Sequence, residues 1–174
     1  MTKQVAAGAL FLAALPLSCQ TLQNSKVEEL LRFTLNENPQ QILTLLGRPS
    51  RIEDSAAGFQ SWEYEFSGDE ESDDNSPPAW LVCLTIPKRE ILSVTRNFDK
   101  PQEVDRLFTA AQTAAYYWPS KETPQFSVRL RQLSGGLLLL AMGTAKPKDR
   151  TTQLMLIRRS ALKTFLPWLA EQLR

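Results

Sequence analysis

Six short segments of the chain have the residue pattern of β-strands, and these segments constrain the fold more than any other feature. Trp62, Tyr64 and Phe66 alternate with polar residues, a period of two that is typical of a strand with one buried face. Turn residues join two pairs of the other segments, at residues 87–90 and at the Ser-Gly-Gly of residues 134–136. The six predicted strands cover residues 61–66, 79–86, 91–98, 126–131, 137–142 and 154–157.

Apolar residues at helical spacing predict four helices. Ser25 and Glu28 form a capping box ahead of the first helix, while Asn38 caps the second and Gly47 ends it. The third helix runs to the aromatic residues 116–118, and the last contains Pro167, which either kinks a helix or marks its first turn. The predicted helices cover residues 26–35, 39–46, 100–118 and 160–173.

The order of these elements predicts an α+β fold. Two helices would pack on a three-stranded antiparallel sheet, followed by a helix, three more antiparallel strands and a C-terminal helix. The predicted boundaries are a leader at residues 1–19, a first unit at 20–98 and a second unit at 99–174. The sequence leaves two arrangements open, namely two small domains or one sheet that extends across both units.

The first nineteen residues have the pattern of a secretion signal. Lys3 precedes an uncharged, mostly apolar run over residues 5–17, and the small residues Ser18 and Cys19 follow it. The run is shorter than the roughly 20 residues that a membrane-spanning helix needs. We therefore expect export, to the periplasm or to the outer membrane.

Cys19 is a candidate for lipidation, because Ser18 is the small residue that a lipoprotein signal has before its cysteine. Pro16 stands where such a signal has a leucine-type residue, so the sequence leaves open whether Cys19 is lipidated or removed. In either case Cys83 has no cysteine partner and no intrachain disulfide is expected. The apolar strand around Cys83 predicts a buried thiol.

The chain contains no histidine, which removes the commonest general base and metal ligand. No phosphate-binding loop or dinucleotide-binding glycine motif is present, and no carboxylate pair stands out. Residues 68–78 carry five acidic residues, and their composition favours a solvated loop over the spaced ligands of a calcium-binding EF-hand. The sequence thus predicts a protein that is not an enzyme, with no catalytic residues, cofactor or metal.

Part of the chain carries a family pattern in three segments. They are residues 42–50 (ILTLLGRPS), residues 62–66 (WEYEF) and a hairpin that closes on residues 91–94 (ILSV). Together these segments resemble the BamE (SmpA/OmlA) family of outer-membrane assembly lipoproteins, over residues 25–97. The resemblance implies two helices on a three-stranded antiparallel sheet. The same arrangement also resembles the repeats of secreted β-lactamase-inhibitor proteins.

Charge is divided along the chain although the net charge is only +1. Residues 20–86 contain four basic and twelve acidic residues, a net charge of −8, whereas residues 87–174 contain fifteen basic and seven acidic residues, a net charge of +8. Such asymmetry can steer an anionic partner to the second half, unless the two halves face and neutralise each other. Because Arg129 and Arg131 alternate with apolar residues, we expect them to share the face away from the core. The candidate contacts for an anionic membrane surface are Arg129, Arg131, Arg158, Arg159, Lys146 and Lys148.

These patterns favour an exported, non-catalytic binding or scaffold protein with a protein partner in the cell envelope. An accessory subunit of a membrane-associated complex is one such role, and a secreted inhibitor that binds an enzyme is the alternative. A scaffold should expose an apolar or aromatic patch, whereas an inhibitor should present a protruding loop and an enzyme a pocket with convergent polar groups. No nucleic-acid partner is expected of an exported protein.

Overall fold

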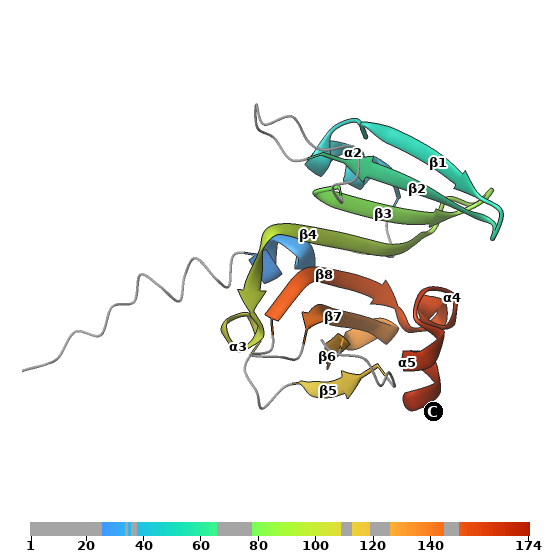
Figure 1. The fold of residues 1–174 in the computed structure, drawn as a ribbon. Coiled ribbons are helices and arrows are strands. Elements are labelled where there is room, and N and C mark those ends of the chain that lie inside the picture. The colour runs from blue at the N-terminus through green and yellow to red at the C-terminus, as the bar shows by residue number, and fades with distance from the viewer. Residues whose placement is uncertain are drawn as a thin grey trace, which may run out of the picture.

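The computed structural model describes residues 26–33, 35, 38–65, 78–108, 113–118, 126–144 and 150–174. In these residues, eight antiparallel strands form one sheet in the order β1-β2-β3-β4-β8-β7-β6-β5 (Figure 1). The pairing of β4 with β8 joins the strands of the first half of the chain to those of the second. The strands are β1 (Arg51–Ser55), β2 (Phe59–Tyr64), β3 (Trp80–Thr85), β4 (Ile91–Glu103), β5 (Ala114–Tyr117), β6 (Phe126–Gln132), β7 (Leu137–Thr144) and β8 (Arg150–Arg158).

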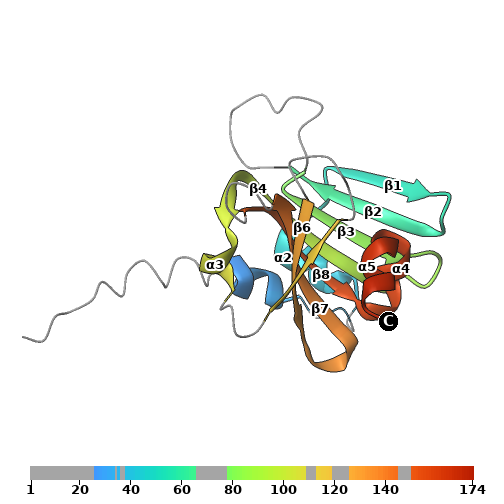
Figure 2. The same cartoon turned by 60° about the horizontal axis from the view of Figure 1, so that its bottom comes forward.

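The helices are short and lie on both faces of this sheet (Figures 1 and 2). Residues 26–31 are helical, and α2 (Gln40–Leu46) and α3 (Val104–Leu107) follow along the chain. Near the C-terminus, the 3-10 turn η3 (Arg159–Ala161) leads into α4 (Leu162–Phe165) and α5 (Pro167–Gln172). Pro167 is the first residue of α5, so the expected break in the C-terminal helix is confirmed.

The predicted fold class, with two helices on a three-stranded sheet and a second helix-and-strand unit, is wrong. The resemblance of residues 25–97 to the BamE family is wrong for the same reason. Strands β2, β3 and β4 are neighbours, but β1 extends the sheet beyond β2 and β8 extends it beyond β4. The free edge that β4 would have in a three-stranded sheet pairs with β8 from Ser93 and Ile157 onward. This pairing satisfies buried backbone groups that would otherwise lack partners.

The boundary that we placed between residues 98 and 99 falls inside β4. Of the two arrangements left open by the sequence, the structure has the one in which a single sheet extends across both units. The predicted leader and nearly all of the acidic segment 68–78 lie outside the described residues.

Three differences separate the observed elements from the predicted ones. β1 was not predicted, since its residues RIEDS contain one apolar side chain. The helix predicted over residues 100–118 is wrong, because β4 continues to Glu103, α3 lasts one turn, and Ala114–Tyr117 form β5. The helix predicted over residues 26–35 is described as helical only to residue 31. The helix α2 and the strands β2, β3, β4, β6, β7 and β8 are confirmed near the predicted positions.

The sheet separates two hydrophobic cores. Along β7, Leu139 and Ala141 belong to the first core, while Leu138, Leu140 and Met142 belong to the second. This alternation follows from the period of two along a strand. The helical residues 26–31, α2 and α3 cover the first core, and η3, α4 and α5 cover the second. Because both faces are buried, the central strands read as continuous apolar runs.

Candidate functional site

The predicted cationic surface is only partly assembled in the structure. Arg129 and Arg131 do share one face of β6, as expected. They pair with Ala141 and Leu139 of β7, which belong to the first core, so the prediction that this face points away from the core is wrong. Both arginines are half-buried. The prediction failed because it assumed that only one face of the sheet was covered.

The other arginines of the prediction are bound to backbone carbonyls. Arg158 donates from Nε to the carbonyl of Ile91 at 2.8 Å and from a terminal nitrogen to the carbonyl of Leu35. Arg159 donates instead to the carbonyl of Leu173 at the end of α5, at 3.2 Å. Neighbouring arginines thus serve different parts of the fold, and a role in anionic contact stays a prediction. Lys146, Lys148 and the candidate lipidation residue Cys19 lie outside the described residues.

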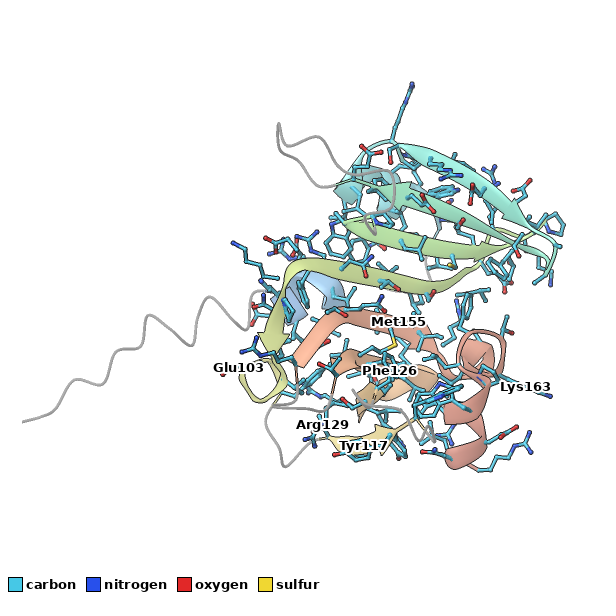
Figure 3. The ribbon with its side chains drawn as sticks, in the orientation of Figure 1. Glu103, Tyr117, Phe126, Arg129, Met155 and Lys163 are labelled. Carbon is cyan, nitrogen blue, oxygen red and sulfur yellow. The ribbon has the colours of Figure 1, made fainter. Side chains whose placement is uncertain are left out.

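A cluster of aromatic side chains lies where the last strand of the sheet meets α5, and we call it the aromatic surface. Tyr117, Trp118 and Phe126 are 42%, 40% and 37% exposed. Trp168 of α5 contacts two of them in edge-to-face geometry, with ring centroids 5.1 Å from Trp118 and 6.4 Å from Phe126. These three are the exposed large aromatic residues of the described chain. Trp118 and Phe126 share the face of the sheet that Trp168 covers, whereas Tyr117, which pairs with Ser127, points to the other face. Figure 3 labels Tyr117 on β5 and Phe126 on β6.

Backbone pairing holds the aromatic surface in place. Trp118 donates its backbone N–H to the carbonyl of Phe126 at 3.0 Å, which continues the β5–β6 pairing by one residue. The side chain of Gln172 in α5 donates to the carbonyl of Tyr117 at 3.4 Å. Sequence reasoning placed residues 116–118 at the end of a helix and missed this surface. A run of three aromatic residues just before Pro119 was the available signal.

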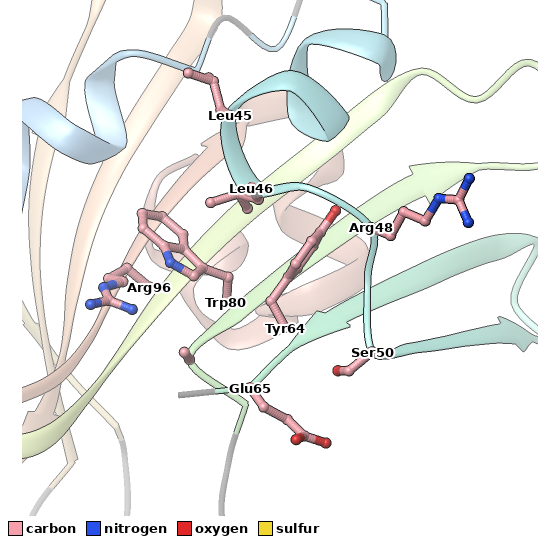
Figure 4. A pocket seen from close by; sticks show the side chains of 9 residues that line it. Leu45, Leu46, Arg48, Ser50, Tyr64, Glu65, Trp80 and Arg96 are labelled. Atoms are coloured by element: carbon pink, nitrogen blue, oxygen red, sulfur yellow. The ribbon is translucent and has the colours of Figure 1, made fainter. Parts of the chain in front are cut away.

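A second feature is a cavity of about 530 Å³ between the end of α2 and the sheet, which we call the Tyr64 cavity (Figure 4). Tyr64, Trp80 and Arg96 are register neighbours across β2, β3 and β4 and form its floor. The turn after α2 closes one side, because Gly47 adopts φ 80° and ends the helix. The cavity is lined by Leu45, Leu46, Arg48, Ser50, Tyr64, Glu65, Ala79, Trp80 and Arg96.

The Tyr64 hydroxyl is the most unusual group of this cavity. Tyr64 is 6% exposed, and its hydroxyl oxygen has no hydrogen-bond partner among the described residues. A buried polar group without a partner costs about 1–3 kcal/mol. Burial raises the pKa of Tyr64 to about 12, so the phenol stays protonated at neutral pH. Beside it, the guanidinium of Arg96 lies over the Trp80 ring at 4.7 Å.

Cys83 is buried, as the sequence predicted, and is a free cysteine. Burial raises the pKa of its thiol, an effect that a hydrogen bond with Ser93 partly offsets. Among the described residues, no cluster of three or more histidine, cysteine, aspartate or glutamate side chains is arranged to hold a metal ion. None of the described helices has the length and apolar character needed to span a membrane.

No protein-family model and no curated protein matches the sequence. Among solved structures, the fold is similar to a cysteine-rich secretory protein from Staphylococcus aureus, with a TM-score of 0.49 and 10% sequence identity. The superposition covers 76% of this chain and 46% of that one, so the chain spans less than half the length of that protein. A likeness at this level assigns neither a fold family nor an activity.

Proposed function

We propose that the protein is an exported, non-catalytic binding protein that docks onto a protein partner in the cell envelope through its aromatic surface. The clustering of the exposed Trp118 and Phe126 around Trp168 carries the proposal. Tyrosine and tryptophan dominate the energetic centres of protein interfaces. Support for export comes from the signal pattern of residues 1–19.

The position of the aromatic surface favours an extended segment of the partner. β5 is the last strand of the sheet in the described chain, so its outer edge offers backbone groups to an added strand, apart from the Tyr117 carbonyl that accepts from Gln172. The aromatic side chains flank that edge and would contact alternate side chains of the added strand.

The charges near the aromatic surface favour an acidic partner. The C-terminal segment that contains Trp168 carries the exposed basic side chains of Arg159, Lys163 and Arg174 and one exposed acidic side chain, that of Glu171. Opposite charge on the partner would speed association and fix the register of docking. An accessory subunit that binds an acidic, extended segment of a membrane-associated complex is the role that these features support best.

Site-specific photocrosslinking of the full chain in its native host tests the proposal. p-Benzoylphenylalanine replaces Trp118 in one strain and Ile52 in another, since Ile52 is 55% exposed on the opposite edge strand, β1. We expect a discrete protein crosslink from position 118 and none of the same mass from position 52. Equal crosslinking from both positions would contradict docking at the aromatic surface.

A vesicle experiment separates this proposal from binding to an anionic membrane surface. The full chain is sedimented with vesicles of phosphatidylcholine, alone or with phosphatidylglycerol, at low and high salt. Our proposal predicts no sedimentation that depends on the anionic lipid. Salt-sensitive binding to the anionic vesicles that is lost in the Arg129→Ala/Arg131→Ala variant would instead favour the cationic surface predicted from the sequence.

A further inference from the structure

The Tyr64 cavity has the dimensions of a small-molecule site and is separate from the aromatic surface. Its volume of about 530 Å³ lies within the roughly 300–1,000 Å³ of known ligand pockets. Its floor is a register row on the neighbouring strands β2, β3 and β4, so the sheet itself fixes the spacing of Tyr64, Trp80 and Arg96. A site built on paired strands holds its side chains more firmly than a site on loops.

The buried Tyr64 hydroxyl offers a hydrogen bond to a ligand. No described residue partners it, although polar groups with this degree of burial are nearly always hydrogen-bonded. Its hydroxyl points toward the turn after α2, between Leu46 and Arg48 (Figure 4). A tyrosine phenol is protonated at neutral pH, so the hydroxyl can donate to an anionic oxygen.

The charges of the lining favour an anion. Two arginines, Arg96 and the exposed Arg48, and one acidic residue, Glu65, line the cavity. Trp80 holds the Arg96 guanidinium against its ring face at 4.7 Å, which limits the orientations open to that side chain. Guanidinium groups match the geometry of carboxylates better than lysine does.

The remaining lining favours an apolar body next to the anionic group. Leu45, Leu46 and Trp80 are apolar residues of the lining. Leu45 is 44% exposed, so part of this apolar surface is in contact with water. An apolar group in this position would cover leucine surface that is open to water.

We propose that the Tyr64 cavity binds a carboxylate attached to an apolar group. The Tyr64 hydroxyl donates to the carboxylate, Arg48 and Arg96 supply positive potential, and Leu45, Leu46 and Trp80 contact the apolar group. Two sources share this chemistry, namely the C-terminus of a peptide that ends in a hydrophobic residue and a free fatty acid. The proposal does not depend on the function of the aromatic surface.

Calorimetric titration of the full chain tests the proposal with three probes. N-acetylphenylalanine carries the carboxylate, N-acetylphenylalanine amide lacks it, and decanoate represents a fatty acid. We expect binding of at least one carboxylate with a Kd below 1 mM, and binding of the amide that is at least about tenfold weaker than that of its acid. Tighter binding of N-acetylphenylalanine identifies a peptide C-terminus as the source, and tighter binding of decanoate identifies a fatty acid.

The Tyr64→Phe variant keeps the ring and removes only the hydroxyl. We expect it to bind the preferred carboxylate at least about fivefold more weakly, with a thermal midpoint equal to or above that of the wild type, because an unpartnered group is removed. Tyr116→Phe, a half-buried tyrosine on the opposite face of the sheet, should change neither property. The proposal is overturned if no carboxylate binds, if acid and amide bind equally, or if Tyr64→Phe leaves binding unchanged.

Discussion

The burial of both faces of the sheet predicts that consecutive residues of one strand are equally important for stability. Leu139 and Leu140 are neighbours in β7, each is 0% exposed, and they belong to different cores. Truncation of either to alanine removes three buried carbon atoms, worth roughly 0.8 kcal/mol each in transfer free energy, and leaves a cavity. We therefore expect each variant to lose about 2–5 kcal/mol of unfolding free energy.

Equilibrium unfolding in urea measures these losses, with linear extrapolation to zero denaturant. Ile52→Ala is the control, because Ile52 is 55% exposed on the edge strand β1, and it should change the free energy by less than about 0.5 kcal/mol. A loss below about 1 kcal/mol for either leucine would show that its face of the sheet is not covered. That result would refute the two-core description.

Three further predictions concern single side chains. Arg158→Gln should destabilise the protein by about 1–3 kcal/mol, since two carbonyls lose a charged donor. Arg159→Gln removes only an exposed hydrogen bond from η3 to the Leu173 carbonyl and should cost less than about 0.5 kcal/mol in the same urea assay. In a Cys19→Ser chain, Cys83 is the one remaining thiol, and it should react with Ellman's reagent only after unfolding. It is buried, and its raised pKa lowers the fraction of thiolate. Full reaction of the native protein within minutes would contradict this prediction. The pKa of Tyr64 rises from 10.0 to about 12 on folding, so between these pH values the folded state keeps a proton that the unfolded state loses. The unfolding free energy should therefore fall as pH rises from 10 to about 12. The fall should be less steep in Tyr64→Phe, which lacks the titrating hydroxyl.

The sequence was sufficient to locate the strands that bury apolar side chains. The alternation of Trp62 and Tyr64 placed them on a buried face, and the structure confirms both in the first core. The continuous apolar residues of β7 were also identified as a buried strand. These strands can be recognised in the sequence because burial requires apolar residues at a fixed period.

The sequence did not predict the elements whose stability comes from backbone pairing. β1 is exposed along almost its whole length and carries charged residues, so it has no apolar period to detect. β5 reads as a helix because Ala114 and Ala115 follow earlier apolar residues at helical spacing, yet the strand pairs with β6 over Ala114 to Tyr117. Tertiary pairing overrides such a weak local preference.

The pairing of β4 with β8 could not be predicted from local patterns either, since the paired residues lie from 64 (Ser93 and Ile157) to 47 (Glu103 and Arg150) positions apart in the sequence. The same limit applies to both candidate sites. Trp168 meets Trp118 from a separate element, and Arg96 meets Tyr64 only through the register of three strands. A sequence pattern indicates which face of a single helix or strand is buried. These sites, in contrast, form only where separate helices and strands come together.

The proposed function is tested most directly by the affinity of the photocrosslinked partner for variants of the aromatic surface. The purified partner is titrated against the wild-type chain, Trp118→Ala and Ile52→Ala. A buried tryptophan anchor at an interface contributes about 2 kcal/mol or more, so Trp118→Ala should weaken the Kd by about thirtyfold or more. Ile52→Ala should stay within about twofold of the wild type. A Kd for Trp118→Ala within about threefold of the wild-type value would contradict docking at the aromatic surface.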